Sequence, residues 1–216
     1  MEQFISEKSF LHKHFTTTKA AGDMKNEAIR NNFFISVNLN PANLVLTNQI
    51  HGNNIRVVDS SNRNSFIDNC DGLVTENKDI MLGIFTADCV PLLMFAENSK
   101  IKIAIHAGWK SVYDGIIENA FGILKKKFAV KYQEIVVYIG PHIRSCCYKV
   151  GYEIGTKFNV KLIDKKFDLS SIICNKLKKN GVNKIFDIKY CTYHEQDLFF
   201  SYRRDRCTER IISVIV

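Results

Sequence analysis

Two short apolar runs near the middle of the chain, Ile80 to Phe85 and Ile101 to Ile105, are each followed by polar groups that can do chemistry. Asp88-Cys89 follows the first run, and His106 follows the second. Runs this short, rich in β-branched residues and bounded by turn-forming residues, predict buried strands. Strand ends open into loops, where a rigid scaffold presents reactive side chains. We therefore expect Cys89 and His106 to lie at neighbouring strand ends.

A third run has the same form, because Leu44 to Ile50 is followed by His51-Gly52. His51, Cys89 and His106 together offer two imidazoles and one thiolate, a donor set suited to zinc with a fourth position open for water or substrate. Taken singly, a cysteine between apolar residues is most often a small buried hydrophobe, and a lone histidine is most often only hydrogen-bonded. Their shared position at strand ends favours a catalytic metal site.

Other chemistries also fit these residues. Cys89 can act as a nucleophile paired with His106, as in a cysteine hydrolase. Two histidines and one cysteine can hold copper for the oxidation of phenols if a distant methionine, such as Met94, is the axial ligand. A non-catalytic basic binding module is a further alternative.

Several motifs follow one another along the chain: Asn48 to Gly52, Asp71 to Thr75, Thr86 to Pro91, His106 to Trp109, Ile139 to Ile143 with Cys147-Tyr148, and Phe199 to Asp205. In this order they resemble the motifs of the YfiH family, which is also called the laccase-domain or polyphenol oxidase family. The resemblance implies a zinc-dependent purine nucleoside phosphorylase and adenosine deaminase that acts on adenosine, inosine, guanosine and methylthioadenosine. It also implies an α+β fold in which mixed β-sheets pack face to face with helices on the outer sides, an αββα sandwich.

Two acidic residues are candidates for supporting this site. We expect Cys89, Asp88 and His106 to be catalytic, with Asp88 orienting a ligand from behind or transferring a proton. Substitution of Asp88 is then expected to slow turnover more than it weakens metal binding. Asp71 can also orient a ligating imidazole, although an aspartate before glycine is more often a turn former.

The charge of the chain favours anionic partners. Its 30 basic and 22 acidic residues give a formal net charge of +8, which suits inorganic phosphate. Arg203, Arg204 and Lys110 are the candidate substrate or phosphate ligands, although Arg203 and Arg204 can equally pair with Asp205 or Glu209. The family usually has arginine near Thr18 and at Lys110, so we expect phosphorolysis to be the weaker activity here. No RNA-binding motif accompanies the basic residues, so we expect no nucleic-acid partner.

Strands and helices alternate along the chain, with strands in the majority, which predicts a mixed α and β architecture. We expect one domain over residues 1–216, because no linker or repeat interrupts the sequence. Helices are expected at Ala28 to Phe34, Val112 to Phe128, Gly151 to Val160 and Ser170 to Lys179, the last capped by Asp168. Further strands are expected at Ile55 to Asp59, Ile135 to Ile139, Val182 to Ile188, Leu198 to Tyr202 and Ile211 to Val216.

The seven cysteines have no regular disulfide spacing and are odd in number, which suits a reducing compartment. The amino-terminal residues lack the apolar core of a secretory signal, and no run approaches the length of a membrane span. We therefore expect a cytoplasmic, monomeric protein without a membrane partner. Cys146-Cys147 can suggest metal or redox chemistry, but adjacent cysteines do not readily chelate one ion together, and the resemblance assigns them no ligand role.

Overall fold

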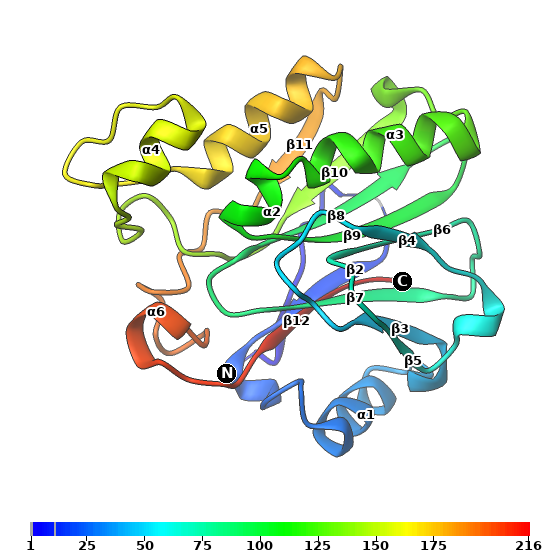
Figure 1. Ribbon diagram of the computed structural model, residues 1–216. Coiled ribbons are helices and arrows are strands. Elements are labelled where there is room, and N and C mark those ends of the chain that lie inside the picture. Colours follow the sequence, from blue (N-terminus) through cyan, green and yellow to red (C-terminus); the bar gives the residue numbers. More distant parts are fainter. Residues whose placement is uncertain (1, 11) are drawn as a thin grey trace.

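The computed structural model describes residues 2–10 and 12–216, and its strands form two six-stranded sheets that pack face to face (Figure 1). The first sheet contains, in spatial order, β1 (Phe4–Ile5), β2 (His14–Thr17), β12 (Ile211–Ile215), β7 (Met81–Thr86), β3 (Leu44–Thr47) and β5 (Ser65–Ile67). The second contains β11 (Lys184–Asp187), β10 (Ile135–Ile139), β8 (Val90–Ala96), β9 (Ile101–Ala107), β6 (Gly72–Thr75) and β4 (Ile55–Val57).

Helices cover the outer face of each sheet and complete the αββα sandwich (Figure 1). One helix, α1 (Glu27–Ser36), packs on the first sheet, whereas α6 (Tyr202–Asp205) lies at one end of the sandwich. The second sheet is covered by α2 (Trp109–Tyr113), α3 (Ile116–Phe128), α4 (Tyr152–Phe158) and α5 (Leu169–Lys179). The α+β class and the layer order expected from the family resemblance are confirmed.

The central strands are apolar on both faces because each face is covered. In β8, Leu92 and Met94 pack toward the helices while Leu93 packs between the sheets. In β9, Ile103 and Ala104 divide between the two sides in the same way. Strands buried on both faces form continuous apolar runs instead of alternating with polar residues. This explains why the middle of the sequence contains unbroken apolar segments.

One predicted strand is wrong, and one long strand was missed. Residues 198–201 form no strand, and α6 begins at Tyr202, where the Ser201 side chain accepts the amide hydrogen of Arg204. Phe199 and Ser201 are buried without ladder pairing. Their segment is therefore as apolar as a buried strand, although it belongs to no sheet. The missed strand is β8, whose Pro91 argues against a central strand but stands near its start, opposite His106.

The expected helix at Val112 to Phe128 is two helices, α2 and α3. Gly115 separates them with a φ of 89°, a conformation that glycine adopts without steric cost. The other predicted helices and strands are present, most of them with ends that differ by a few residues, and Asp168 caps α5 by accepting the amide hydrogen of Ser171. Among the described residues, no helix combines the length and apolarity needed to cross a membrane.

Candidate metal centre

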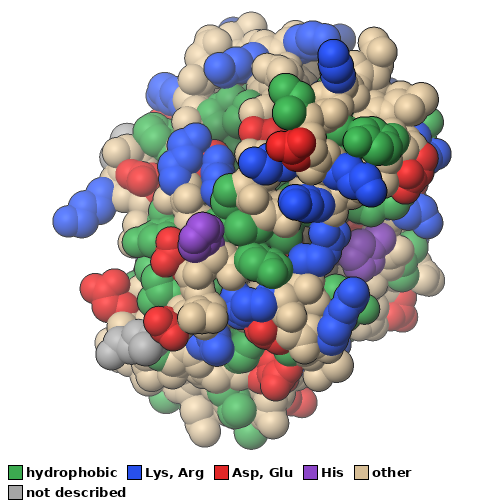
Figure 2. Space-filling view, turned by 90° about the vertical axis from the view of Figure 1, so that its left-hand side faces the viewer, with side chains coloured by type: hydrophobic (Ala, Val, Ile, Leu, Met, Phe, Trp, Pro, Cys, Tyr) green, Lys and Arg blue, Asp and Glu red, His purple; other side chains and the backbone are tan. Residues whose placement is uncertain are grey.

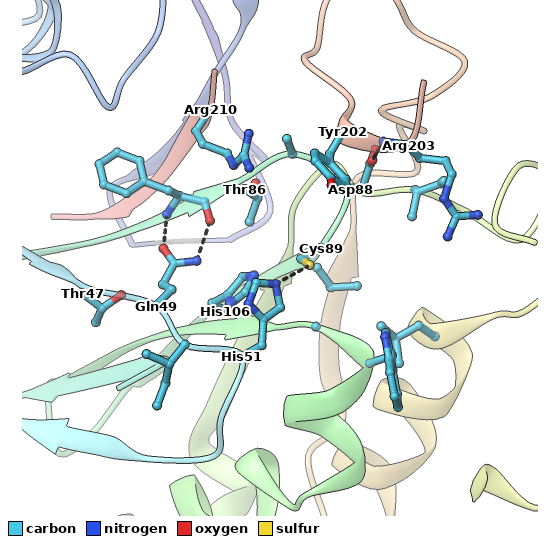
Figure 3. A pocket seen from close by; sticks show the side chains of 18 of the residues that line it. Thr47, Gln49, His51, Thr86, Asp88, Cys89, His106, Tyr202, Arg203 and Arg210 are labelled. Atoms are coloured by element: carbon cyan, nitrogen blue, oxygen red, sulfur yellow. Dashed lines mark hydrogen bonds between the residues drawn. The ribbon is translucent and has the colours of Figure 1, made fainter. Parts of the chain in front are cut away.

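His51, Cys89 and His106 converge at one end of the sandwich (Figure 3). Cys89 immediately precedes β8 and His106 lies near the end of β9; the antiparallel register pairs Pro91 with His106. His51 follows β3 on the neighbouring sheet. Their ligand atoms all lie within 4.8 Å of one another, and Cys89 Sγ is 3.9 Å from His51 Nε2. The structure thus brings together all three residues of the expected metal site.

A buried carboxylate holds the imidazole of His106 and the backbone of His51. Asp71 Oδ1 lies 2.8 Å from His106 Nδ1 and also accepts the amide hydrogen of His51 at 2.9 Å. Asp71 Oδ2 accepts the amide hydrogens of Ile50 and Gly52 at 3.1 and 2.8 Å. These bonds hold His51 at a φ of 58°, a conformation that costs a non-glycine residue on the order of 1 kcal/mol. Asp71 therefore orients the ligands, and it is more than the turn former that an aspartate before glycine usually is.

Asp88 does something different from what the sequence led us to expect. It lines the cavity and has a φ of 93°, but its Oδ1 accepts hydrogen bonds from Thr192 and Ser201, both at 2.7 Å. Its Oδ2 accepts the amide hydrogen of Arg203 at 2.6 Å. The expectation that Asp88 orients a metal ligand is therefore corrected, since this carboxylate fixes the segment from Thr192 to Arg203 instead.

The electrostatics of the cluster favour a thiolate. Burial alone raises the pKa of the Cys89 thiol, but the imidazoles of His106 and His51 outweigh burial and lower this pKa to about 6. Burial lowers the pKa of His106, whereas the Cys89 thiolate and the Asp71 carboxylate outweigh it and raise this pKa to about 9. The thiolate is the form of cysteine that binds metals and attacks electrophiles.

The donor set fits zinc in kind and in spacing. Tetrahedral zinc, with bonds of about 2.1 Å to nitrogen and about 2.3 Å to sulfur, holds such donors about 3.6 Å apart, close to the measured 3.9 Å. Gly108 leaves room beside the cluster, because a Cβ there would lie 3.2 Å from His51 Cδ2 and 3.4 Å from Cys89 Sγ. His51, Cys89 and His106 are therefore able to hold a zinc ion.

Gly108→Ala is expected to weaken zinc retention by about tenfold, because the new methyl group presses against two ligand side chains and about 1.4 kcal/mol corresponds to tenfold in affinity. The φ of Gly108 is −69°, so alanine brings no backbone strain. Gly122→Ala is the control, since a Cβ there meets no heavy atom of its described surroundings within 4 Å. Chelator competition measures both, and equal affinities would show that Gly108 does not limit the site.

A cavity of about 660 Å³ opens in front of the cluster. Phe66, Phe85 and Trp109 supply aromatic surface to its lining. Thr47 and Thr86 also line it, and the hydroxyl oxygens of both are buried without a hydrogen-bond partner among the described residues. Buried polar atoms are normally hydrogen-bonded, so these two hydroxyl groups are unusual; both oxygens are covered by protein, and each must turn about χ1 to meet a ligand in the cavity.

The cations at the cavity differ from the predicted set. Arg203 lines it, and so do Lys25 and Arg210, which the sequence argument did not single out. Lys110 is not among the lining residues, so its expected place beside the substrate is corrected. Figure 2 shows Lys and Arg side chains spread over the face of the molecule beside α4 and α6 and lying around hydrophobic side chains near its middle.

Arg204 is also absent from the cavity lining. It pairs with Asp205 through bonds of 2.8 and 2.7 Å, and its remaining donors reach the carbonyl groups of Thr192, Tyr193 and Phe199. Arg204 therefore forms the ion pair with Asp205 that was the alternative to phosphate binding. No donor of its guanidinium is left for phosphate. The guanidinium of Arg203 lies 5.3 Å from the centre of the Tyr148 ring and donates to the Lys149 carbonyl.

Met94 cannot serve as an axial ligand. It lies within β8, fully buried against the helices, and five residues of strand span about 16 Å from Cys89. No methionine of the described chain lines the cavity. The methionine ligand of the copper alternative is therefore wrong.

Sequence reasoning also missed Gln49, whose side chain pairs with both the amide and the carbonyl of Phe85 at 2.9 Å (Figure 3). This bond ties the His51 segment to the strand that leads to Cys89. Gln49 belongs to the motif from Asn48 to Gly52, so the resemblance contained a clue to it. Lys25 and Arg210 lie in segments with no such clue, and only the tertiary fold brings them to the cavity.

Known proteins match much of this chain. The family model described as multi-copper polyphenol oxidoreductase laccase matches residues 5–216. Proteins named purine nucleoside phosphorylase from Clostridium acetobutylicum and Haemophilus influenzae are 35% and 32% identical over 156 and 148 residues, which cover 68% and 61% of this chain. The aligned parts span 66% and 58% of those two relatives, less than two thirds of each.

Solved structures show the same fold. The Bacillus licheniformis protein YfiH superposes with a TM-score of 0.87 at 25% identity and covers 94% of this chain and 91% of its own. YlmD from Geobacillus stearothermophilus gives a TM-score of 0.88 at 24% identity, covering 100% and 98%. With the family model matching almost the whole sequence, the chain belongs to the YfiH, or laccase-domain, family.

Proposed function

We propose that this chain is a zinc-dependent purine nucleoside phosphorylase that also deaminates adenosine and acts on methylthioadenosine. The observation that carries the proposal is the cluster of His51, Cys89 and His106 at the wall of a cavity large enough for a small ligand. Nucleoside-sized ligands suit cavities of about 300–1,000 Å³. The names of the relatives from Clostridium and Haemophilus support the same substrate class.

When bound, zinc supplies Lewis acidity, which polarises a substrate oxygen or acidifies water. The residues of the chain prepare the site for it. Asp71 fixes the imidazole of His106, and the aromatic groups Phe66, Phe85 and Trp109 offer faces on which a purine can stack. Thr47 and Thr86 carry hydroxyl groups without a partner, and rotation about χ1 would turn these groups toward the polar edges of a base or a ribose.

Phosphate is proposed to lie near Arg203, Arg210 and Lys25, the cations of the cavity lining. Arginine contacts phosphate through paired donors, which a lysine does not offer. Some donors of Arg203 and Arg210 already reach backbone carbonyl groups, so the phosphate site is only partly free. This supports phosphorolysis as the weaker of the two activities.

Incubation of the zinc-loaded protein with adenosine at varied phosphate tests the proposal. Deamination yields inosine and ammonia without phosphate, whereas phosphorolysis yields adenine only when phosphate is present, and hypoxanthine reports both steps. We expect inosine at every phosphate concentration and free base that rises with phosphate. If none of the three products exceeds the level of a Cys89→Ala control, the purine assignment is wrong.

Thr86→Val is expected to lower kcat/KM for the nucleoside by about tenfold, the loss of one hydrogen bond of about 1.4 kcal/mol. Valine keeps the shape of threonine, so zinc content and stability should not fall. Ser111→Ala is the matched control, because it removes another buried, unpartnered hydroxyl group that does not line the cavity. Equal losses in the two variants would contradict a substrate contact at Thr86.

A cysteine hydrolase is the second candidate function. Cys89 contacts His106, and His106 in turn contacts Asp71. The three residues can therefore serve as nucleophile, base and orienting carboxylate, the arrangement of a catalytic triad. The second imidazole, His51, favours the metal site, because a triad needs only one imidazole.

Metal analysis of protein purified without added metal separates zinc from the copper oxidase alternative, for which stoichiometric copper with strong blue absorption is required. A cytoplasmic location remains a proposal, supported by the seven free thiols, and a monomeric state remains a proposal as well.

A further inference from the structure

A second group of thiols and an imidazole lies outside the cavity. Cys146, Cys147 and His194 place their ligand atoms within 4.8 Å of one another. The two sulfur atoms are 3.5 Å apart, and Cys147 Sγ is 3.7 Å from His194 Nδ1. Behind them, Cys191 Sγ lies 3.8 Å from Cys146 Sγ. Two thiols and one imidazole thus meet at the surface, and the third thiol, that of Cys191, lies buried beside Cys146.

The local backbone explains how adjacent cysteines can face the same point. The amide groups of Cys147 and Tyr148 both donate to the carbonyl of Arg144, at 2.9 and 2.8 Å. This tight turn curves the chain so that the two neighbouring sulfur atoms converge. The objection that adjacent cysteines do not readily share one ion therefore does not apply to this turn.

The other two donors come from a second turn. The amide of His194 donates to the carbonyl of Cys191 at 3.1 Å, which closes the segment between them. The Thr192 amide donates to the His142 carbonyl at 3.1 Å, and the Arg144 amide lies 3.5 Å from Cys191 Sγ. Backbone contacts thus hold the two turns side by side, so the donors are brought together before any ion binds.

We propose that Cys146, Cys147 and His194, with Cys191 as the fourth donor, bind a second thiophilic cation, and that this ion is Zn²⁺. A tetrahedral zinc ion holds two sulfur donors about 3.8 Å apart and a sulfur and a nitrogen about 3.6 Å apart. The distances of 3.5, 3.8 and 3.7 Å from Cys146 to Cys147, from Cys146 to Cys191 and from Cys147 to His194 agree with three of the six edges, and Cys191 must move closer to the rest of the group to complete the tetrahedron. Cys146 and His194 are exposed, so an ion can reach the site from solvent.

The two zinc sites have different chemical characters. His51, Cys89 and His106 leave a fourth position open, whereas three cysteines and a histidine close the coordination of zinc, as in structural sites. The second site joins segments that also build the cavity: Ile143 and Tyr148 line it, and Thr192 bonds to Asp88. An ion there ties these two parts of the cavity wall together.

Metal counting with paired variants tests this site independently of any activity. We expect about two zinc ions per wild-type chain and about one in Cys89→Ala, in the double variant Cys146→Ser/Cys147→Ser, and in the surface variant His194→Ala. Combining Cys89→Ala with the double variant should leave none. Cys207→Ser is the control, because Cys207 is a free thiol outside both clusters. These zinc counts are expected because each ion is held by several of the named donors, and loss of a donor weakens its site.

Cobalt substitution gives a second readout. Co²⁺ bound by several thiolates produces a stronger sulfur-to-metal charge-transfer band than Co²⁺ bound by one. The wild-type band should fall by more than half in Cys146→Ser/Cys147→Ser and by less than half in Cys89→Ala. Chelation should also lower the Tm of Cys89→Ala, which holds zinc only at the second site, but not the Tm of the variant that combines Cys89→Ala with Cys146→Ser/Cys147→Ser, because binding to the native state stabilises it.

Two results would overturn the second site. One is a Cys146→Ser/Cys147→Ser protein, folded by circular dichroism, that holds as much zinc as the wild type. The other is a disulfide between Cys146 and Cys191, found by peptide mapping in zinc-saturated protein, since a disulfide consumes two of the four donors.

Discussion

Cys89→Ala is expected to abolish zinc retention at the candidate centre and to lower kcat by about a thousandfold. The substitution removes the only thiolate of the cluster and leaves two imidazoles, and loss of about 4 kcal/mol of transition-state stabilisation corresponds to that factor. The fold should persist, because Cys89 belongs to none of the three hydrophobic clusters. Zinc content, turnover and the Tm of the metal-free protein measure the three effects.

The zinc count should be made in the Cys146→Ser/Cys147→Ser background, so that the proposed surface site does not contribute. Cys207→Ala serves as the thiol control. A Cys89→Ala protein that loses turnover yet keeps full metal occupancy would refute the ligand assignment and favour the cysteine hydrolase. His51→Ala and His106→Ala are expected to repeat the loss of both metal and turnover.

Asp71→Asn is expected to have the second largest effect, weakening zinc binding by about 10- to 100-fold and lowering the free energy of unfolding by about 2–4 kcal/mol. Each carboxylate oxygen of Asp71 faces two N–H donors, counting His106 Nδ1 as protonated. Whichever way the asparagine amide turns, its NH₂ group meets two of these donors. The imidazole of His106 also loses its carboxylate partner.

Asp88→Asn is the matched control for this prediction. Its partners are two hydroxyl groups and one amide, and the hydroxyl groups can rotate to accept from an asparagine NH₂ group. We expect zinc affinity within about threefold of wild type, with turnover reduced more than metal binding. Chelator competition and chemical denaturation of both variants measure the contrast. If Asp88→Asn weakens zinc binding as much as Asp71→Asn, the roles given to these carboxylates are wrong.

The metal cluster could be predicted from the sequence because each ligand directly follows, or closely follows, an apolar strand. The role of Asp71 could not, since its hydrogen bonds reach three consecutive amides that only a folded loop presents together. Lys25 and Arg210 meet at the cavity because the Arg210 amide and the Asp23 side chain bond over a long sequence separation. Such contacts leave no periodic pattern in a sequence.

The fold was predictable where strands are continuous and apolar, as in β7, β9 and β10. It was not predictable where burial and ladder pairing diverge. Ser201 is buried where it donates to Asp88, and Phe199 is buried against the Tyr190 ring; neither pairs with a strand. The layer order came from the family resemblance, since local patterns do not determine which strands become neighbours.

The position of β12 has a consequence for synthesis on the ribosome. Residues 211–215 lie between β2 and β7, and Ile211 pairs with Thr86 just before the Asp88-Cys89 turn. A nascent chain therefore exposes the facing edges of β2 and β7 until residue 215 has left the exit tunnel. Unpaired edges invite association between chains, so slow translation near this codon stretch would prolong the aggregation-prone stage and delay the formation of the metal cluster.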